Sequence, residues 1–518
     1  MKMLLLCALT LSAQVPYSRI LNTELDQGNW LTYSGNLQGH RFSPLHQINQ
    51  RTVSALKPVW VYQIDRRDKF ETVPLIADGI MYISEPPSDV TALDARTGRV
   101  LWSFRRGIPD NIPICCGTVN RGVALLDDKV FVGTVDAHLI ALDAKTGNIV
   151  WDTVVENWKT GHSITVAPLA YKDKIAVGIA GGEFGIRGFL DAYEAKTGKR
   201  AWRTYTVPVA GELGVDTWEG ESFKNGAATT WTTGSYDPGS NTIFWGTGNP
   251  GPDWNDDHRK GDNLFSDSVL ALDGDTGKMK WYFQFTPHDT HDWDTTQVPV
   301  LVDRKGQKQL LLANRNAFFY VLDRTTGEFI RGKAFAKQTW AKGLDAKGRP
   351  MLVEGMTPTK QGVLVYPSVP GATNYYSPAY SPLTDLFYVN ARDEGAMYYT
   401  EDKPWQVGKW WLGGRWIFTP NEERHGAVRA LDPETAGIKW EFPLHTAPWA
   451  GILATAGGLV FAGTDEGHFL ALDHESGKLL WRFPAGGRIL SSPVTFLADG
   501  KQHIAIAAGH DIFVFGLE

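Results

Sequence analysis

Short apolar segments alternate with polar turns along most of the chain, and one pattern of positions recurs. In its fullest form the pattern reads Ala-Leu-Asp-x-x-Thr-Gly-x-x-x-Trp. Its copies begin at Ala92, Ala141, Ala192, Ala271, Ala430 and Ala471 and end at Trp102, Trp151, Trp202, Trp281, Trp440 and Trp481. A degenerate copy begins at Val321 and carries Arg331 in the tryptophan position, and a half-copy runs from Ala55 to Trp60. The sequence therefore contains eight repeats.

This pattern predicts strands joined by tight turns. An apolar strand ends at Ala-Leu, the Asp and the Thr-Gly pair form the turn because Gly readily adopts positive φ, and a second strand carries the Trp. Apolar stretches such as Lys129–Gly133 and Leu459–Gly463 supply a preceding strand. Three or four strands in every ~40–50 residues are typical of a propeller blade. We therefore expect an all-β, eight-bladed β-propeller in which the repeat tryptophans wedge between blades.

Two intervals between repeats are long. Trp202 and Trp281 are 79 positions apart and Arg331 and Trp440 are 109 apart, whereas most intervals span 41 to 51 residues. Insertions in repeat proteins form loops on one face, often the binding face. The first insertion leads into a segment rich in acids and histidines, and the second contains the aromatic segment Trp405–Trp416, a candidate cover for the mouth of a central funnel.

The N-terminus and the composition indicate where the protein works. Residues 1–14 contain one Lys, a short apolar run and then small residues, which is the shape of a secretory signal too short to span a membrane. The alternative is a hydrophobic N-terminal strand. We expect export to the periplasm and a single propeller domain over residues 15–518. A net charge of −6 argues against a nucleic-acid partner.

Two cysteines are adjacent, Cys115 and Cys116, and the third, Cys7, lies in the signal-like segment. In an exported protein neighbouring thiols can oxidise to a vicinal disulfide, although the ~3.8 Å between consecutive Cα atoms is below the usual disulfide range. The alternative is two unpaired buried cysteines. The chain has no Cys-x-x-Cys-His sequence, which would attach a c-type haem.

The segment Pro287–Asp294 places three carboxylates and two imidazoles in eight residues. Asp292 and Asp294 in this segment offer hard oxygen ligands. Glu183 and Asn249 each lie in a glycine-containing loop after an apolar strand and offer further oxygen ligands. Together these side chains suit Ca²⁺ or another large hard cation.

The histidines of the same segment support a rival site. His288 and His291, with Asp289 or Asp292, contain the ligands of a two-His-one-carboxylate metal centre. The alternative is a hydrogen-bonded network in which these side chains only support the loop. The spacing of the residues leaves this choice open.

These features together resemble the pyrroloquinoline-quinone (PQQ)-dependent alcohol dehydrogenases, the methanol and ethanol dehydrogenase family of quinoproteins. The resemblance extends from about Asn29 to the C-terminus, and three segments follow the order and spacing of the family: 115–122, 246–250 and 287–292. It implies oxidation of a primary alcohol to the aldehyde, with PQQ and one Ca²⁺ or lanthanide ion as cofactors.

The resemblance also implies how the cofactor is held. The flat quinone lies between a Cys115–Cys116 disulfide and the indole of Trp231, on which it stacks. Arg121 and Thr165 match residues that bind its anionic and polar edge. Further cofactor contacts match Glu71, Gly181, Gly182, Thr229, Asn374 and Trp449.

The metal and catalytic residues follow from the same resemblance. Glu183, Asn249 and Asp292 match the metal shell, in which the cation polarises the C5 carbonyl of the quinone. Asp292 also matches the general base, which takes the hydroxyl proton while hydride passes to C5, and Arg315 matches the arginine that orients this carboxylate. Electrons then pass to an external acceptor, and we expect a soluble cytochrome c because the chain has no haem motif.

Three residues depart from the pattern of the family. Ala180 replaces a frequent Ser, which removes one cofactor hydrogen bond. His291 replaces a frequent Trp or Tyr and is a candidate pocket wall. Asp294 stands where lanthanide-dependent members carry Asp and calcium-dependent methanol dehydrogenases carry a small residue. We expect Asp294 to be a further metal ligand that favours a lanthanide over Ca²⁺.

Two other interpretations are a cofactor-free propeller that serves as a scaffold for protein assembly and a quinoprotein sugar dehydrogenase. A scaffold needs neither the vicinal cysteines nor the Glu, Asn and Asp ligand set, and the sugar branch generally lacks the cysteine pair. The sequence leaves open which alcohol is oxidised and the oligomeric state, with a homodimer as one option.

Overall fold

The computed structural model describes residues 14–65 and 68–517, so the predicted signal lies outside the described residues except for its last position. Within the described part of the chain nearly all regular structure is β-strand, as predicted, and the α-helix α1 (Tyr17–Leu21) is short. Short 3-10 helices lie in the connections: η1 (Thr23–Leu25), η2 (Val53–Ala55), η3 (Trp158–Thr160), η4 (Gly182–Phe184), η5 (Val215–Thr217), η6 (Ser222–Asn225) and η7 (Asn421–Glu423). No helix among these residues is long and apolar enough to cross a membrane.

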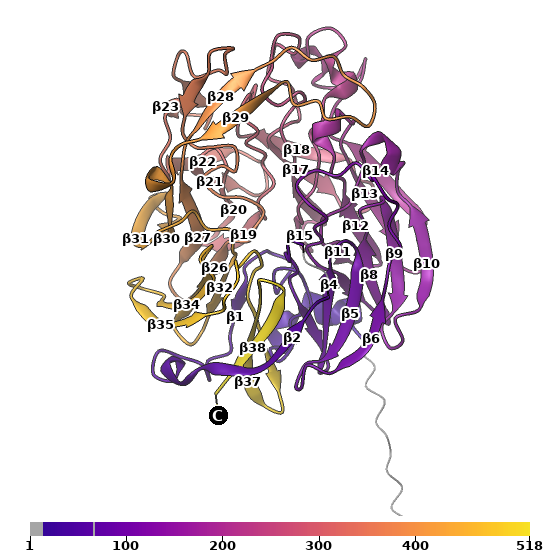
Figure 1. The fold of residues 1–518 in the computed structure, drawn as a ribbon, viewed down its shortest axis with the longest axis vertical. Coiled ribbons are helices and arrows are strands. Elements are labelled where there is room, and N and C mark those ends of the chain that lie inside the picture. The colour runs from indigo at the N-terminus through magenta and orange to yellow at the C-terminus, as the bar shows by residue number, and fades with distance from the viewer. Residues whose placement is uncertain (1–13, 66–67, 518) are drawn as a thin grey trace, which may run out of the picture.

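Among the described residues, eight sheets have four or five strands each, and five of these sheets are built from consecutive strands (Figure 1). These five are β3 (Leu75–Ala77), β4 (Ile80–Glu85), β5 (Asp89–Asp94) and β6 (Val100–Phe104); β7 (Ala124–Leu126), β8 (Lys129–Gly133), β9 (His138–Asp143) and β10 (Ile149–Val154); β11 (Leu169–Tyr171), β12 (Lys174–Gly178), β13 (Phe189–Glu194) and β14 (Arg200–Tyr205); β15 (Ser235–Asp237), β16 (Thr242–Gly246), β17 (Ser268–Asp273) and β18 (Met279–Gln284); and β19 (Val300–Arg304), β20 (Gln307–Ala313), β21 (Phe318–Asp323) and β22 (Phe329–Ala334).

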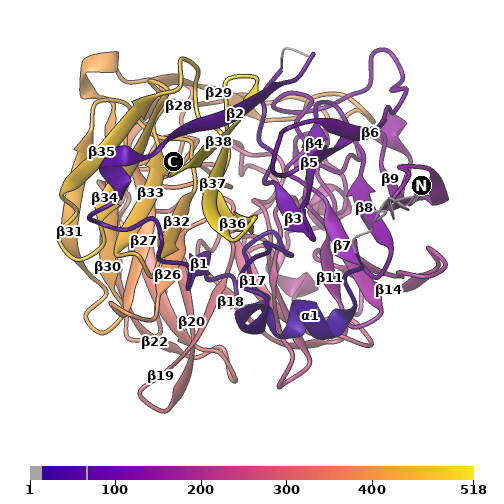
Figure 2. The same ribbon diagram turned by 90° about the horizontal axis from the view of Figure 1, so that it is seen from below.

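The other three large sheets include strands that are distant in sequence. They are β26 (Ala379–Ser381), β27 (Leu386–Asp393), β30 (His425–Asp432) and β31 (Gly437–Leu444); β32 (Ile452–Thr455), β33 (Leu459–Gly463), β34 (His468–Asp473) and β35 (Leu479–Pro484), with β1 (Phe42–Ser43) added in parallel; and β36 (Val494–Ala498), β37 (Lys501–Ala508), β38 (Asp511–Gly516) and β2 (Lys57–Gln63). Because β2 pairs with β38, an early strand of the chain and its C-terminal strand lie in one sheet (Figure 2).

Two small sheets belong to the long insertion before Trp440. They contain β23 (Ala341–Leu344) with β24 (Pro350–Leu352), and β25 (Val363–Val365) with β28 (Ala396–Thr400) and β29 (Gly414–Phe418). Figure 1 shows β23, β28 and β29 together at one end of the molecule. The insertion therefore builds structure on one face, as the repeat spacing predicts.

The repeat motif forms the turn between the last two strands of a sheet. In the first full copy, the Asp94 carboxylate accepts the backbone N–H groups of Arg96 and Thr97, each at 3.0 Å. Gly98 follows with a φ of +73°, a conformation that Gly adopts without a steric penalty. The strand pairing shifts register between Ala92 and Leu93.

The repeat tryptophans connect neighbouring sheets. The indole N–H of Trp102, on β6, donates to the carbonyl of Ala144 in the turn of the next sheet at 3.0 Å. Arg331, which replaces the tryptophan in the degenerate copy, makes the corresponding bond to the carbonyl of Pro433 at 2.9 Å. Corresponding indole bonds are made by Trp60, Trp151, Trp202, Trp440 and Trp481. The same position thus links sheet to sheet even where the side chain has changed.

The turn glycines provide a test of this contact. Gly147 and Gly500 both have a φ of +74°, but a Cβ on Gly147 would lie 2.5 Å from the Trp102 ring, whereas none lies within 4 Å at Gly500. We expect Gly147→Ala to lower the free energy of unfolding by ~2–5 kcal/mol, from backbone strain plus overpacking, and Gly500→Ala by only ~1–2 kcal/mol from strain. Thermal and chemical denaturation measure this difference, and equal effects of the two variants would contradict the contact.

Candidate active site

A cavity of about 420 Å³ gathers side chains from loops of many sheets. Its wall contains most of the residues that the sequence singled out: Glu71, Cys115, Cys116, Arg121, Thr165, Gly181, Glu183, Thr229, Trp231, Asp292, Asp294, Arg315, Asn374 and Trp449. Gly182 and Asn249 do not line the cavity directly. Gly182 lies in the chain between two wall residues, Gly181 and Glu183, and the backbone N–H of Asn249 donates to the wall residue Asp294. The site is therefore assembled by the fold from positions more than 370 residues apart.

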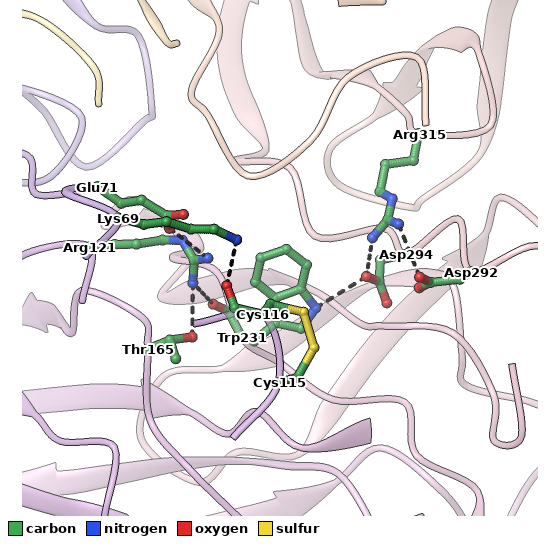
Figure 3. Close-up of a disulfide and its surroundings, with 10 residues drawn as sticks. All are labelled: Lys69, Glu71, Cys115, Cys116, Arg121, Thr165, Trp231, Asp292, Asp294 and Arg315. Atoms are coloured by element: carbon green, nitrogen blue, oxygen red, sulfur yellow. Dashed lines mark hydrogen bonds and ion pairs between the residues drawn. A yellow bond between two sulfur atoms is a disulfide. The ribbon is translucent and has the colours of Figure 1, made fainter. Parts of the chain in front are cut away.

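The vicinal disulfide between Cys115 and Cys116 is present, with their Cα atoms 3.8 Å apart. Lys69 lies over this loop, and its Nζ donates to the carbonyl oxygen of Cys116 at 2.6 Å (Figure 3). Asp68 accepts the backbone N–H of Thr118 at 3.1 Å. The disulfide loop is thus held from one side by residues that precede Glu71 in the chain.

One end of the cavity is cationic. Arg121 is paired with Glu71 at 2.9 Å and donates to the hydroxyl of Thr165 at 2.8 Å (Figure 3). Its guanidinium carbon also lies 4.8 Å from the ring centroid of Trp231 and 4.5 Å from that of Tyr375. The Nε of this buried Arg121 has no hydrogen-bond partner. A polar or anionic ligand edge is a suitable partner for this donor.

The other end of the cavity is acidic and centres on Arg315. This guanidinium forms a short ion pair with Asp294 and a longer contact of 3.5 Å with Asp292 (Figure 3). Asp294 also accepts the indole N–H of Trp231 at 3.2 Å and the backbone N–H of Asn249 at 2.7 Å. Arg315 therefore contacts Asp294 more closely than Asp292, the carboxylate it is expected to orient.

Glu183 completes the acidic end. It lies in η4, after β12, and one of its carboxylate oxygens is within 4.8 Å of both disulfide sulfurs. The sulfurs are bonded to each other and are not thiolates, so this grouping is not a thiolate metal site. It places Glu183 beside the disulfide and in the same cavity as Asp292 and Asp294.

Burial makes these carboxylates costly to ionise. The pKa of Glu183 is raised to about 7, chiefly by burial and in smaller part by the negative charge of Asp294, while a backbone hydrogen bond and Arg315 oppose the shift. Burial also raises the pKa values of Asp292 and Asp294, again against the effect of Arg315. Several acids that raise one another's pKa in a closed space are a suitable environment for a multivalent cation, which offsets both causes.

Asp253 is a member of this cluster that the sequence interpretation missed. It lines the cavity, is 3% exposed, and accepts the side-chain N–H of Asn249 at 2.9 Å. This bond fixes the amide so that the Asn249 oxygen is its remaining polar atom. The signal in the sequence was a carboxylate four residues after Asn249 in the same loop.

The histidines of the Pro287–Asp294 segment are not among the residues that line the cavity. His288 contacts the carboxylate of Asp256 at 2.9 Å, and His291 contacts the carbonyl of Met356 at 2.9 Å and stacks on Trp293. Asp289 accepts the backbone N–H groups of His291 and Trp293. These residues support the loop. His291 was expected to form part of the pocket wall, but it does not line the cavity.

Several further residues line the cavity, and those outside the long insertion carried no clear signal in the sequence. They are Lys69, Tyr375, Trp254, Val369, Pro370 and, from the long insertion, Trp410, Leu412 and Trp416. The last three belong to the aromatic segment that was a candidate cover of the funnel. That segment does border the cavity.

Comparison with known proteins identifies the fold and the family. A family profile described as PQQ, "Glucose/ethanol/alcohol dehydrogenase, beta-propeller domain", matches residues 30–332. A second profile, described as "Outer membrane protein assembly factor BamB", matches the shorter range 424–512.

Several named relatives match over nearly the whole chain. Quinoprotein alcohol dehydrogenase PedH of Pseudomonas putida is 39% identical over 528 residues, covering 96% of this chain and 89% of the relative. A quinoprotein ethanol dehydrogenase of the same species is 36% identical, covering 96% of this chain and 88% of its own length.

Solved structures agree with these relatives. A europium-containing methanol dehydrogenase superposes with a TM-score of 0.92 at 32% identity, covering 96% of this chain and 100% of that chain. The quinohemoprotein alcohol dehydrogenase ADHIIG of Pseudomonas putida gives a TM-score of 0.92 at 34% identity, covering 98% and 82% of the two chains. The chain belongs to the PQQ β-propeller family of quinoprotein alcohol dehydrogenases and is an oxidoreductase that acts on alcohols.

Proposed function

We propose that residues 15–518 form one eight-bladed propeller that oxidises a primary alcohol to the aldehyde with PQQ and one metal ion. Eight large sheets and the indole bonds between neighbouring sheets support the blade count and the docking role of the tryptophans. The observation that carries the activity is the meeting of Asp292, Asp294, Glu183 and Arg315 in the cavity that also contains the Cys115–Cys116 disulfide.

The cavity fits a flat, anionic cofactor. The disulfide and the Trp231 ring supply two polarisable surfaces, and Arg121, whose Nε lacks a partner, supplies a donor for a carboxylate. Glu71, Thr165, Thr229, Asn374 and Trp449 would line its edges, with Gly181 and Gly182 allowing close approach of the backbone. When bound, PQQ supplies the oxidant that takes up the hydride leaving the alcohol carbon.

The acidic end fits a metal ion. Glu183, Asn249, Asp292 and Asp294 would be its protein ligands, since they offer oxygen atoms in one place and their charges repel one another without a cation. The extra carboxylate of Asp294 favours a trivalent lanthanide over Ca²⁺ on grounds of charge. When bound, such an ion would supply Lewis-acid polarisation at this end of the cavity.

The proton of the alcohol passes to this chain. Asp292, whose side chain is 22% exposed, is the carboxylate that can accept the hydroxyl proton. Arg315 contacts both Asp292 and Asp294 and offsets negative charge that develops beside it. An external acceptor, for which a soluble cytochrome c is the candidate, regenerates the oxidised enzyme after export to the periplasm.

Reconstitution tests the proposal. The metal-free protein is mixed with PQQ and either Ca²⁺ or La³⁺, bound PQQ is followed by absorbance, and a dye-linked assay measures turnover of primary alcohols. We expect turnover in the wild type and a loss of at least ~100-fold in kcat for Asp292→Asn, because the general base is removed. Asp262→Asn, which alters a surface ion pair with Arg349, is the control. Absence of PQQ binding with either metal would overturn the function.

The metal preference has its own test. We expect the wild type to turn over faster with La³⁺ than with Ca²⁺, and Asp294→Ala to lose this preference. Because Asp294 also pairs with Arg315, Asp294→Asn is made alongside to retain the shape of the side chain. Equal Ca²⁺-supported activity in wild type and Asp294→Ala, with no lanthanide effect in either, contradicts the assignment.

Stability against pH tests the acidic cluster without turnover. In metal-free protein the pKa of Glu183 is raised from 4.5 to about 7, so its contribution to stability is present below pH 4.5 and is lost as the pH rises through about 7. The loss is at most ~3 kcal/mol. We expect the thermal midpoint to fall between pH 5 and 8 in the wild type and to fall less in Glu183→Gln.

The exposed Glu24→Gln variant is the control for this experiment and should behave as the wild type. Saturating La³⁺ should remove most of the decline, because bound cation stabilises the ionised acids. The prediction is contradicted if the thermal midpoint of the wild type falls as little as that of Glu183→Gln, or if La³⁺ does not change the fall. Either result would show that ionisation of Glu183 does not destabilise the folded protein.

A further inference from the structure

The connection between β28 and β29 crosses the cavity. Residues 401–416, here called the strap, run from the end of β28 to the third residue of β29. Figure 1 shows β28 and β29 at the upper end of the molecule, with their connecting segment passing over toward the β12–β14 side. The strap therefore joins the insertion of one sheet to loops of others.

The strap is bonded to the turn that carries Glu183. The backbone N–H of Trp411 donates to the carbonyl of Glu183 at 2.7 Å, and the indole N–H of Trp405 donates to the carbonyl of Phe184 at 2.9 Å. The ring of Trp410 lies 5.5 Å from that of Phe184. These three contacts, made by Trp405, Trp410 and Trp411, fix the strap to η4.

A second loop holds the strap from the other side. The backbone N–H of Trp254 donates to the carbonyl of Leu412 at 3.0 Å, and the rings of Trp254 and Trp416 lie 5.0 Å apart. Trp254 directly follows Asp253 in the loop that also contains Asn249. The strap consequently spans the two loops that bear the acidic end of the cavity.

The strap contributes an apolar wall. The strap residues that line the cavity are Trp410, Leu412 and Trp416, and none of them is charged. Trp410 is 44% and Trp416 37% exposed, so both rings border solvent as well as the cavity. Asp292 lines the same cavity. An alcohol whose hydroxyl reaches Asp292 therefore has apolar surface available for its carbon chain.

We propose that the strap is a specificity-determining element and that the enzyme prefers primary alcohols with a long alkyl or aromatic body over methanol. The inference rests on the proposed alcohol oxidation. Methanol has no further carbon to bury, whereas each methylene group that leaves water favours binding by roughly fourfold. Because the strap is held by hydrogen bonds at both sides, the wall is present before substrate arrives, and little of this gain is lost to ordering.

The proposal is tested by measuring substrate selectivity. The sample is the whole chain loaded with PQQ and with the metal that gives the faster turnover. The quantity is kcat/KM for 1-hexanol or benzyl alcohol divided by kcat/KM for methanol. We expect this ratio to be at least ~100 in the wild type, from several buried methylene groups. It should fall about tenfold in Leu412→Ala and in Trp410→Ala, chiefly through a higher KM for the larger alcohols. Leu412→Gln, similar in volume but polar, should lower it as well.

Val407→Ala is the matched control. Val407 is on the same strap and is 57% exposed, but it does not line the cavity, so the ratio should stay at the wild-type value. A tertiary alcohol such as 2-methyl-2-hexanol gives a readout without turnover, because its carbinol carbon has no hydrogen to lose. Its inhibition constant should rise several-fold in Leu412→Ala and stay unchanged in Val407→Ala.

The outcomes separate the two proposals. If the wild type binds PQQ and oxidises alcohols but the ratio is unchanged in Leu412→Ala, Leu412→Gln and Trp410→Ala, the strap does not set specificity. A wild-type preference for methanol also overturns the inference. If no alcohol is oxidised at all, the proposed function fails instead. Absorbance of bound PQQ in each variant shows whether the cavity has kept its structure.

Discussion

Mutual repulsion among carboxylates that line one cavity is the constraint on which this site depends. Asp292, Asp294, Glu183 and Asp253 share one cavity, and Arg315 is the cation that contacts two of them. Left alone, such acids take up protons or move apart. They remain together because each is placed by a loop at the end of a paired strand, so the free energy of the β-sheets opposes the repulsion. A bound cation would offset this repulsion and hold the carboxylates in place as its ligands.

The scaffold meets this demand by making neighbouring sheets rigid with respect to one another. Among the described residues, six repeat tryptophans donate the indole N–H to a carbonyl of the neighbouring repeat, as Trp102 does to Ala144. Large aromatic rings with a satisfied polar atom give both apolar burial and direction. The carboxylates are thereby held by elements that cannot easily adjust to relieve them, which is the arrangement expected of a preorganised site.

The strand pattern and the site chemistry were predictable to different degrees. The Asp-Thr-Gly turns and the Trp positions are local signals, so the sheets follow from the sequence, and the adjacent cysteines and the Pro287–Asp294 acids stand out by composition. Contacts across loops were not predictable from spacing. Nothing local indicates that Arg315 lies closer to Asp294 than to Asp292, or that His291 turns toward Met356. Asp253 and Trp254 resemble ordinary loop residues until the fold brings them to the cavity.

The pairing of β2 with β38 has a consequence for how the molecule is made. The last sheet takes one strand from residues 57–63 and three from residues 494–516, so its hydrogen bonds join segments separated by nearly the whole chain. A ribosome releases the C-terminal strands only when synthesis ends, and contacts of such long sequence separation form slowly. Until then β2 presents an open strand edge, which is prone to pair with other chains. A chaperone that shields this edge during synthesis would therefore protect the yield of folded protein.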